Sequence, residues 1–476
     1  MNSPSTLALA DGSLQPVWIL LAGIILVVIL IAWMRVHAFL SLMLAAVLVG
    51  TLTRFTSGQD GNPIIEACKE SMSEFGQTAA GIAWIIALAA VIGYCLMESG
   101  AADRIVRAML RLFGEQRAGL AMLASAFVLS IPVFFDTVFY LLVPLAQALA
   151  FRMGRQYAYI VVAICSGALI THSLVPPTPG PLIVVESLGL NLGLTILGGI
   201  ALGILPAFLA LRLGRWIDRR MPIELRPGGV VKIEDLKAVA AKPESELPPL
   251  WLSNAPVLLP VVLISLASIL EEFVGPEHMG AFYPVIEVLG YKHVAMFLGT
   301  LIALYLLVRW KGLDRRALWR SLESPLSMAG TIILITSAGG AFGGMIRQSG
   351  IGESLTALTG GTGLSMVLLA WLIAAVMKVA QGSSTIAMIT CAGIMAGILG
   401  AGSAPGFDPF YIFAAIAFGA MFGSWMNDSG FWIVCKMTGF SELETLRTWT
   451  ISVSVVSLAG LVEVLLVHWA FPYPFG

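Results

Sequence analysis

Short polar stretches interrupt four of the apolar segments of this chain, and their side chains could bind an anion or carry a proton. Two stretches lie in the N-terminal half of the sequence and two lie in the C-terminal half. Ionisable residues in so apolar a setting are costly and are usually functional. The candidate site residues are Asp136, Thr137, His172, Ser173, Thr178, Lys378, Gly382, Ser383, Ser384, Thr385, Asn427, Asp428 and Ser429.

The stretch "QGSST" at residues 381–385 favours an anionic ligand. A helix that begins after Gly382 directs its free amide groups and three hydroxyl groups toward whatever lies beyond, and helix N-termini attract anions. Lys378, one turn earlier, adds a positive charge that needs a partner. We therefore expect a small carboxylate substrate.

Two roles are open for Lys378. It could neutralise the substrate carboxylate, or it could form a structural ion pair with Asp136 or Asp428. His172 could contact the substrate or hydrogen-bond an interrupted backbone. A carboxyl group held away from water favours its protonated form, so we expect Asp136 to carry a proton, with Asp428 as the alternative.

The composition predicts that these residues lie in membrane helices. The chain has 476 residues, of which 58% are hydrophobic and 12% charged, with a mean hydropathy of +0.91. A soluble core cannot absorb so much apolar sequence, so we expect an all-α polytopic membrane protein in a lipid bilayer.

Several functional classes are disfavoured by what the sequence contains. The net charge of −1 provides no basic surface for nucleic acid, and no Gly-Lys dipeptide is present to form a P-loop. The five cysteines lack metal-ligand spacing, so we expect no metal or cofactor. A membrane enzyme is the rival from another class, but H-E-x-x-H and G-x-S-x-G motifs are absent, so we expect no enzyme.

Apolar windows long enough to cross a membrane are predicted at residues 17–34, 38–53, 79–97, 193–211, 255–273, 294–309, 328–346 and 450–470. Four further segments carry glycine, proline or polar residues near their middle, at 118–150, 157–190, 363–400 and 409–437. Such interruptions are typical of membrane helices that are broken at a binding site.

The distribution of basic residues predicts the orientation. The loops at 98–117 and 212–254 are rich in arginine and lysine and should be cytoplasmic, as should Arg152 and Arg155. The segment 118–150 then enters and leaves on one side as a re-entrant hairpin. The loops at 348–362 and 401–408 contain no lysine or arginine and should face outward, which makes 363–400 a second, opposite hairpin.

A weak internal repeat supports this arrangement. Ser99-Gly100 matches Ser349-Gly350 at an offset of 250 residues, and the same offset aligns the two hairpin tips and the two broken helices. We expect two inverted repeats, residues 1–211 and 255–476, each with five transmembrane helices and one hairpin, joined by a cytoplasmic linker at 212–254. The scaffold helices would be 17–97 and 255–346, and the hairpins and broken helices would move against them as an elevator.

The chain resembles the gluconate permease (GntP) family of gluconate:proton symporters. The resemblance rests on motifs between about residue 75 and 450: "FGQTAAGI", "ESGAADRI", "FGEQRA", "IPVFFDTVFYLLVPLA", "HSLVPPTPGP", "AQGSSTIAMIT", "NDSGFWIV" and "TLRTWT". It implies an elevator-type secondary transporter with two inverted hairpins, a homodimer in the bacterial cytoplasmic membrane, that imports a sugar acid by proton symport.

Two positions depart from the family pattern. Thr178 stands where the family usually has histidine in "PPHPGP", and Thr137-Val138 stand where it has valine-glycine. The substrate is therefore left open among gluconate, another hexonate, a shorter hydroxy acid, and another small anion or zwitterion such as D-serine. A cation/proton antiporter of the same superfamily is the alternative function, because Asp136 and Asp428 would suit a cation.

Overall fold

The computed structural model describes residues 15–58, 60–153, 156–223, 243–350, 363–399 and 406–473. In these residues the regular secondary structure is helical, without a strand. Eight of the helices described are long and apolar enough to cross a membrane. The predicted all-α polytopic membrane protein is thereby confirmed.

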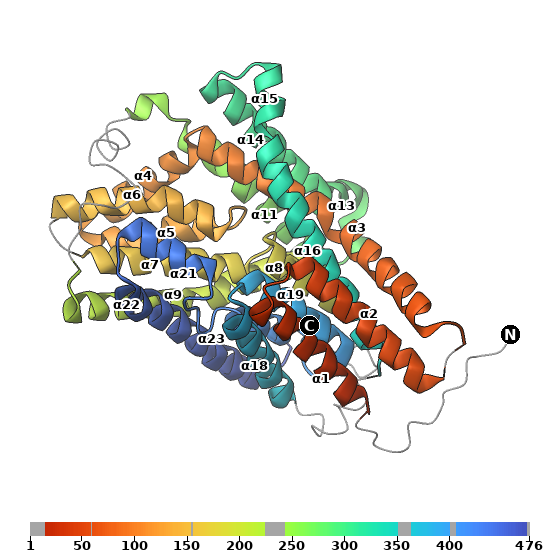
Figure 1. Cartoon of the computed structure of the whole chain (residues 1–476). Coiled ribbons are helices and arrows are strands. Elements are labelled where there is room, and N and C mark those ends of the chain that lie inside the picture. Colours follow the sequence, from red (N-terminus) through yellow and green to blue (C-terminus); the bar gives the residue numbers. More distant parts are fainter. Residues whose placement is uncertain are drawn as a thin grey trace.

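The helices are numbered along the chain (Figure 1). Those that begin before the predicted linker at 212–254 are α1 Gln15–Val28, α2 Ala38–Ser57, α3 Pro63–Glu98, α4 Ala101–Phe113, α5 Ala118–Leu129, α6 Phe135–Met153, α7 Tyr157–Leu174, α8 Pro179–Leu188 and α9 Leu192–Arg220, whose last turns extend into it. Those after it are α11 Leu250–Phe273, α12 Pro276–Met279, α13 Tyr283–Gly290, α14 Lys292–Lys311, α15 Arg315–Ser321, α16 Glu323–Gln348, α18 Gly363–Gln381, α19 Ser384–Leu399, α20 Phe410–Gly419, α21 Ser429–Thr438, α22 Glu442–Thr445 and α23 Ile451–Ala470. Two π-helices, Ile29–Trp33 and Leu446–Thr450, continue α1 and precede α23.

Helix α3 is longer than the apolar window at 79–97. It begins at Pro63, where the side chain of Asn62 accepts hydrogen bonds from the amides of Ile64 and Ile65. Proline at the first helical position and a capping asparagine are strong start signals. The added turns carry Glu66, Lys69, Glu70 and Glu74. These charged residues lower the mean hydropathy, so the turns fall outside the apolar window.

The arginine-rich segments lie together at one end of the molecule. Glu244, from the C-terminal part of the linker, pairs with Arg104 at 2.6 Å and Arg111 at 2.8 Å, both on α4. Lys311 at the end of α14 pairs with Glu98 at the end of α3 at 2.7 Å. Residues 154–155, 224–242, 351–362 and 400–405 of the predicted loops lie outside the described residues, and so do Arg155, Arg226, Lys232, Lys237 and Lys242.

Helix α16 packs both on α2 and α3 and on α19. Helices α2, α3 and α16 pack together, with α14 against α3 and α11, whereas α7 packs between α5 and α9 (Figure 1). Helix α16 packs along α19, which also contacts α8. Every residue of α7 and α20 is buried, so these two helices form the centre of the protein.

Four helix pairs are interrupted where the sequence cannot continue a helix. Pro176 and Pro177 lack a backbone N–H, and Val175 before them is extended, with φ −119° and ψ 110°. Gly382, between α18 and α19, has φ +84°, which is a glycine conformation. The other interruptions are at 130–134, between α5 and α6, and at 420–428, between α20 and α21. Residues from or beside three of them line one cavity.

Candidate functional site

A cavity of about 240 Å³ lies at the centre of the protein and brings together most of the polar residues selected from the sequence. Three short segments and single residues of α7, α16 and the second π-helix surround it. Its lining is Phe134, Phe135, Asp136, Thr137, Leu169, His172, Met328, Ile332, Ser383, Ser384, Thr385, Asp428, Ser429, Gly430 and Trp449. The cavity adjoins a second one that shares Phe134, Thr137 and Met328 and extends to Glu98. The site therefore lies nearer the arginine-rich end of the molecule.

Three helices begin at the cavity. Helix α6 begins at Phe135, α19 at Ser384 and α21 at Ser429. The first amides of a helix have no partner within it and carry the positive end of the helix dipole. In α21, the Asp428 carboxylate accepts one of these amides, from Gly430 at 2.9 Å. The first turns of α19 and α6 leave amides that a bound anion could use.

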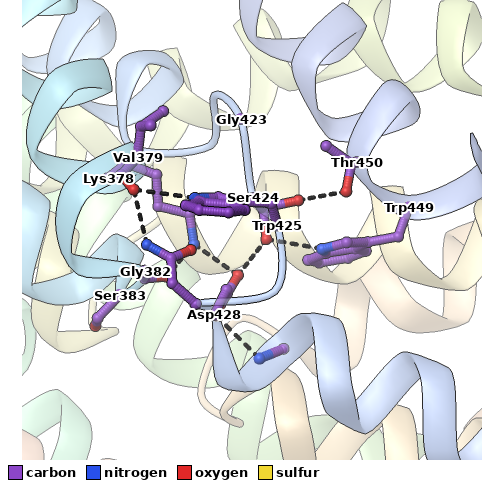
Figure 2. Close-up of polar contacts among 12 residues, drawn as sticks. Lys378, Val379, Gly382, Ser383, Gly423, Ser424, Trp425, Asp428, Trp449 and Thr450 are labelled. Carbon is purple, nitrogen blue, oxygen red and sulfur yellow. Dashed lines mark hydrogen bonds and ion pairs between the residues drawn. The ribbon is translucent and has the colours of Figure 1, made fainter. Parts of the chain in front are cut away.

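Lys378 does not line the cavity. Its side chain is 2% exposed, and its ammonium group bonds the Asp428 carboxylate at 2.7 Å and the carbonyl of Gly382 (Figure 2). This is one of the two open roles, the ion pair with Asp428. Since a buried ion pair neutralises both members, Lys378 offers no free charge to the cavity in this conformation.

Asp428 is held by a network that sequence reasoning missed. Ser424 donates its hydroxyl to the Asp428 carboxylate, and the indole N–H of Trp449 donates to Ser424 at 2.7 Å (Figure 2). The Trp449 ring also packs on Phe135, with centroids 5.1 Å apart. Trp449 lies in the π-helix Leu446–Thr450, a feature often found at functional sites. The available signal was "TLRTWT", which contributed to the family resemblance without a role for its tryptophan.

Asp136 and His172 also line the cavity, but no comparable hydrogen-bond network holds their side chains among the described residues. The Asp136 carboxylate has no ion pair or hydrogen bond with any residue that the structure describes. His172 is buried, its Nδ1 has no hydrogen-bond partner among the described residues, and its ring meets Phe134 edge-on at 6.1 Å. These two side chains are the titratable groups of the site that remain available for substrate or proton.

The remaining selected residues are not part of the cavity lining. The Thr178 hydroxyl donates to the carbonyls of His172 and Val175, at 2.8 and 3.0 Å. It thus supplies hydrogen bonds to carbonyl groups at the C-terminal end of α7. The Asn427 amide donates to the carbonyl of Val379 at 2.7 Å. Ser173 is fully buried, and its hydroxyl has no partner in the described part of the chain.

Gly382 connects the tip between α18 and α19 to the interruption before α21. A Cβ atom at this position would lie 2.3 Å from the carbonyl oxygen of Asn427, so no side chain fits. Together with the Lys378–Asp428 ion pair, this contact joins the two segments into one unit. The unit sets the position of Ser383, Ser384 and Thr385 at the cavity.

Comparison with known proteins gives consistent matches over nearly the whole chain. The model of the GntP family permeases matches residues 15–470. A gluconate permease of Pseudomonas aeruginosa is 34% identical over 448 residues, which cover 94% of this chain and 96% of that protein. The Gnt-II system L-idonate transporter of Escherichia coli (strain K12) is 30% identical, and the match covers 95% of this chain and 99% of that protein. The solved YdaH transporter of Alcanivorax borkumensis shares the fold, with a TM-score of 0.65 over 92% of this chain and 99% of that one, at 14% identity.

Proposed function

The chain belongs to the GntP family of permeases, and on this premise we propose that it imports a sugar acid such as gluconate, or a related small hydroxy carboxylate, by proton symport. The expectation that the chain is not an enzyme is confirmed by its relatives, which are permeases and transporters. The observation that carries the proposal is one central cavity that combines helix N-termini and hydroxyl groups with an unpaired carboxylate.

The anionic group is assigned to the α19 side of the cavity. Ser384 and Thr385 lie in the first turn of α19, and Ser429 begins α21, so hydroxyl and amide donors converge there. Because Lys378 is already paired with Asp428, these donors rather than a free lysine would hold the carboxylate. Asp136, Thr137 and His172, from α6 and α7, would contact the substrate hydroxyl groups.

Proton coupling follows from the charge of this cavity. A substrate carboxylate and an ionised Asp136 would share about 240 Å³ with no unpaired cation among the described lining residues. Two like charges confined in a cavity of this size repel strongly. We assign the proton to Asp136, which would take it up when the anion binds, so that the two would cross the membrane together.

Uptake into proteoliposomes tests this function. We expect an inward pH gradient to drive accumulation of radiolabelled gluconate or another hydroxy carboxylate, and a sodium gradient alone to drive none. The panel should include L-idonate, shorter hydroxy acids and D-serine, because Thr137 departs from the family pattern at the cavity. Sodium-driven uptake, or proton-coupled cation exchange without acid transport, would instead favour the alternative functions.

We also propose that the two halves are inverted repeats with one re-entrant hairpin each, in a bacterial cytoplasmic membrane. The interruptions occur in the same order in both halves, at 130–134 and 175–178, then at 382–383 and 420–428. The contacts of Glu244 with Arg104 and Arg111 support a shared cytoplasmic end for both arginine-rich segments, of which the first, predicted as a loop at 98–117, mostly forms helix α4.

Thiol labelling tests the first hairpin. Single cysteines at Gly114, just before α5, and at Met153, the last residue of α6, should both react with an impermeant reagent from the cytoplasmic side alone. The background should lack the five native cysteines. Labelling of the two positions from opposite sides would mean that 118–150 crosses the membrane, which the repeat does not allow.

Elevator motion and a homodimer complete the proposal. Helices α5–α8 and α18–α21 would move as one body against the scaffold of α1–α3 and α11–α16, which would form the dimer contact. The α16–α19 contact consists partly of Gly339, Gly343 and Gly393, which allow the backbones to approach closely. Full transport with α16 crosslinked to α19 would exclude the motion, and a monomeric mass in lipid nanodiscs would exclude the dimer.

A further inference from the structure

Another polar cavity, of about 210 Å³, lies at the other end of the helices that border the central site. It is distinct from the cavity that adjoins the central site. We call it the outer cavity. It lies between α3, α8, α16 and α19, and glycines of α3, α16 and α19 form part of its wall. Its polar side chains include Glu74, Gln77, Thr78, Glu186 and Arg347.

The outer cavity is separate from the central site. Ser384 of α19 lines the central site and Ala396 lines the outer cavity, which places them about 18 Å apart along a helix with a rise of 1.5 Å per residue. Between them α16 and α19 are in close contact. A Cβ at Gly343 would lie 2.4 Å from the Cα of Gly393, and one at Gly339 would lie 1.7 Å from the Ile389 side chain.

The charges of the outer cavity are balanced in pairs. Arg347 contacts both carboxylate oxygens of Glu74, at 3.2 and 3.3 Å, through Nη2. Glu186 pairs with Lys292 at the start of α14. With each acid matched by a base, this cavity does not repel an anion as two free carboxylates would.

Arg347 is the group that can receive a carboxylate here. Its side chain is 48% exposed, and its contact with Glu74 uses a single guanidinium nitrogen. The planar guanidinium has five N–H donors and binds carboxylates in a two-point geometry. Glu74, Gln77 and Thr78 offer acceptors for hydroxyl groups on the same wall. A cation beside several hydroxyl acceptors matches a polyhydroxy monocarboxylate.

We propose that the outer cavity is a low-affinity substrate site, in which Arg347 binds the carboxylate of a sugar acid before the acid reaches the central site. The inference rests on the proposed transport of such an acid. It also rests on the orientation in which the arginine-rich end, with Glu98 and Arg104, is cytoplasmic, so that Glu74 and Arg347 face outward.

The test compares Arg347→Gln with Arg54→Gln, each of which removes one positive charge. Arg347→Gln should raise the KM for gluconate added outside by about tenfold, because a charge-assisted contact is lost, and Arg347→Lys should recover part of it. The maximal rate and the KM for efflux from inside should stay at the wild-type values. Arg54→Gln is the matched control, because Arg54 pairs with Glu70, one turn from Glu74 on α3 but outside the outer cavity.

Each other result would overturn the inference. A lower maximal rate with an unchanged KM would mean that the Arg347–Glu74 pair only holds α3 against α16. An equal rise in KM from both sides would mean that Arg347 acts on the central site. The proposed function is judged separately, by pH-driven uptake of gluconate in the wild-type protein, so a negative result for Arg347→Gln leaves it intact.

Discussion

The Asp136→Asn variant should still exchange labelled for unlabelled substrate across the membrane but should fail to accumulate it against a gradient. Asparagine keeps the shape and polarity of the side chain at the start of α6, yet it cannot take up a proton. For one proton per substrate, each unit of pH gradient supports about a tenfold accumulation, and this factor should fall to one in the variant. Exchange should persist because a neutral residue no longer opposes the substrate carboxylate.

Two further variants make this measurement decisive. Asp136→Glu retains a carboxyl group and should recover part of the accumulation. Glu98→Gln removes an acid that pairs with Lys311 near the adjoining cavity, and it should leave accumulation unchanged. If Asp136→Asn accumulates substrate normally, the proton is carried by another group, and Asp428 is the next candidate.

The Lys378→Ala variant should lose several kcal/mol of stability. It leaves the carboxylate of Asp428 without its cation at a position where the lysine was 1% exposed. Removing one member of a buried ion pair typically costs about 3–5 kcal/mol. Lys311→Ala is the control, since the Lys311–Glu98 pair is 49% and 39% exposed and should contribute at most about 1 kcal/mol. Thermal unfolding in detergent measures both effects.

A double variant separates the two roles that the sequence leaves open for Lys378. Lys378→Met with Asp428→Asn removes both charges, and asparagine is a good N-cap for α21. Stability should recover in the double variant. If Lys378 serves only to neutralise Asp428, substrate affinity should recover as well. Recovered stability with binding still weakened by at least tenfold would show instead that the lysine contacts the substrate.

Position 382 illustrates how local sequence and tertiary packing act together at the site. The polar stretch after Lys378 predicts a helix start, because glycine and serine end one helix and begin the next. Its need for glycine has two causes. The positive φ is local, but the approach of Asn427 to 2.3 Å from a Cβ position depends on a segment 45 residues later. Local signals therefore predicted the helix interruption at Gly382 but not its contact with Asn427.

The sequence by itself determined the membrane class, the family and the positions of the helix interruptions. Apolar length, missing amides at Pro176 and Pro177, and the motif blocks are local properties that do not depend on how helices pack. It also identified most polar residues of the cavity, because Asp136, His172 and Ser383–Thr385 stand out in an apolar background.

Only the tertiary structure decided which of these residues meet. Lys378 could have paired with Asp136 or with Asp428, since an intramembrane charge needs a partner and both acids are available in the sequence. Helix packing brings Asp428 to 2.7 Å and leaves Asp136 without a partner among the described residues. Ser424 and Trp449 gave no signal of their own, because their role arises from contacts between the interruption at 420–428 and the π-helix Leu446–Thr450. The division of charge in the site, one neutralised pair and one free carboxyl group, is thus a property of the packed helices.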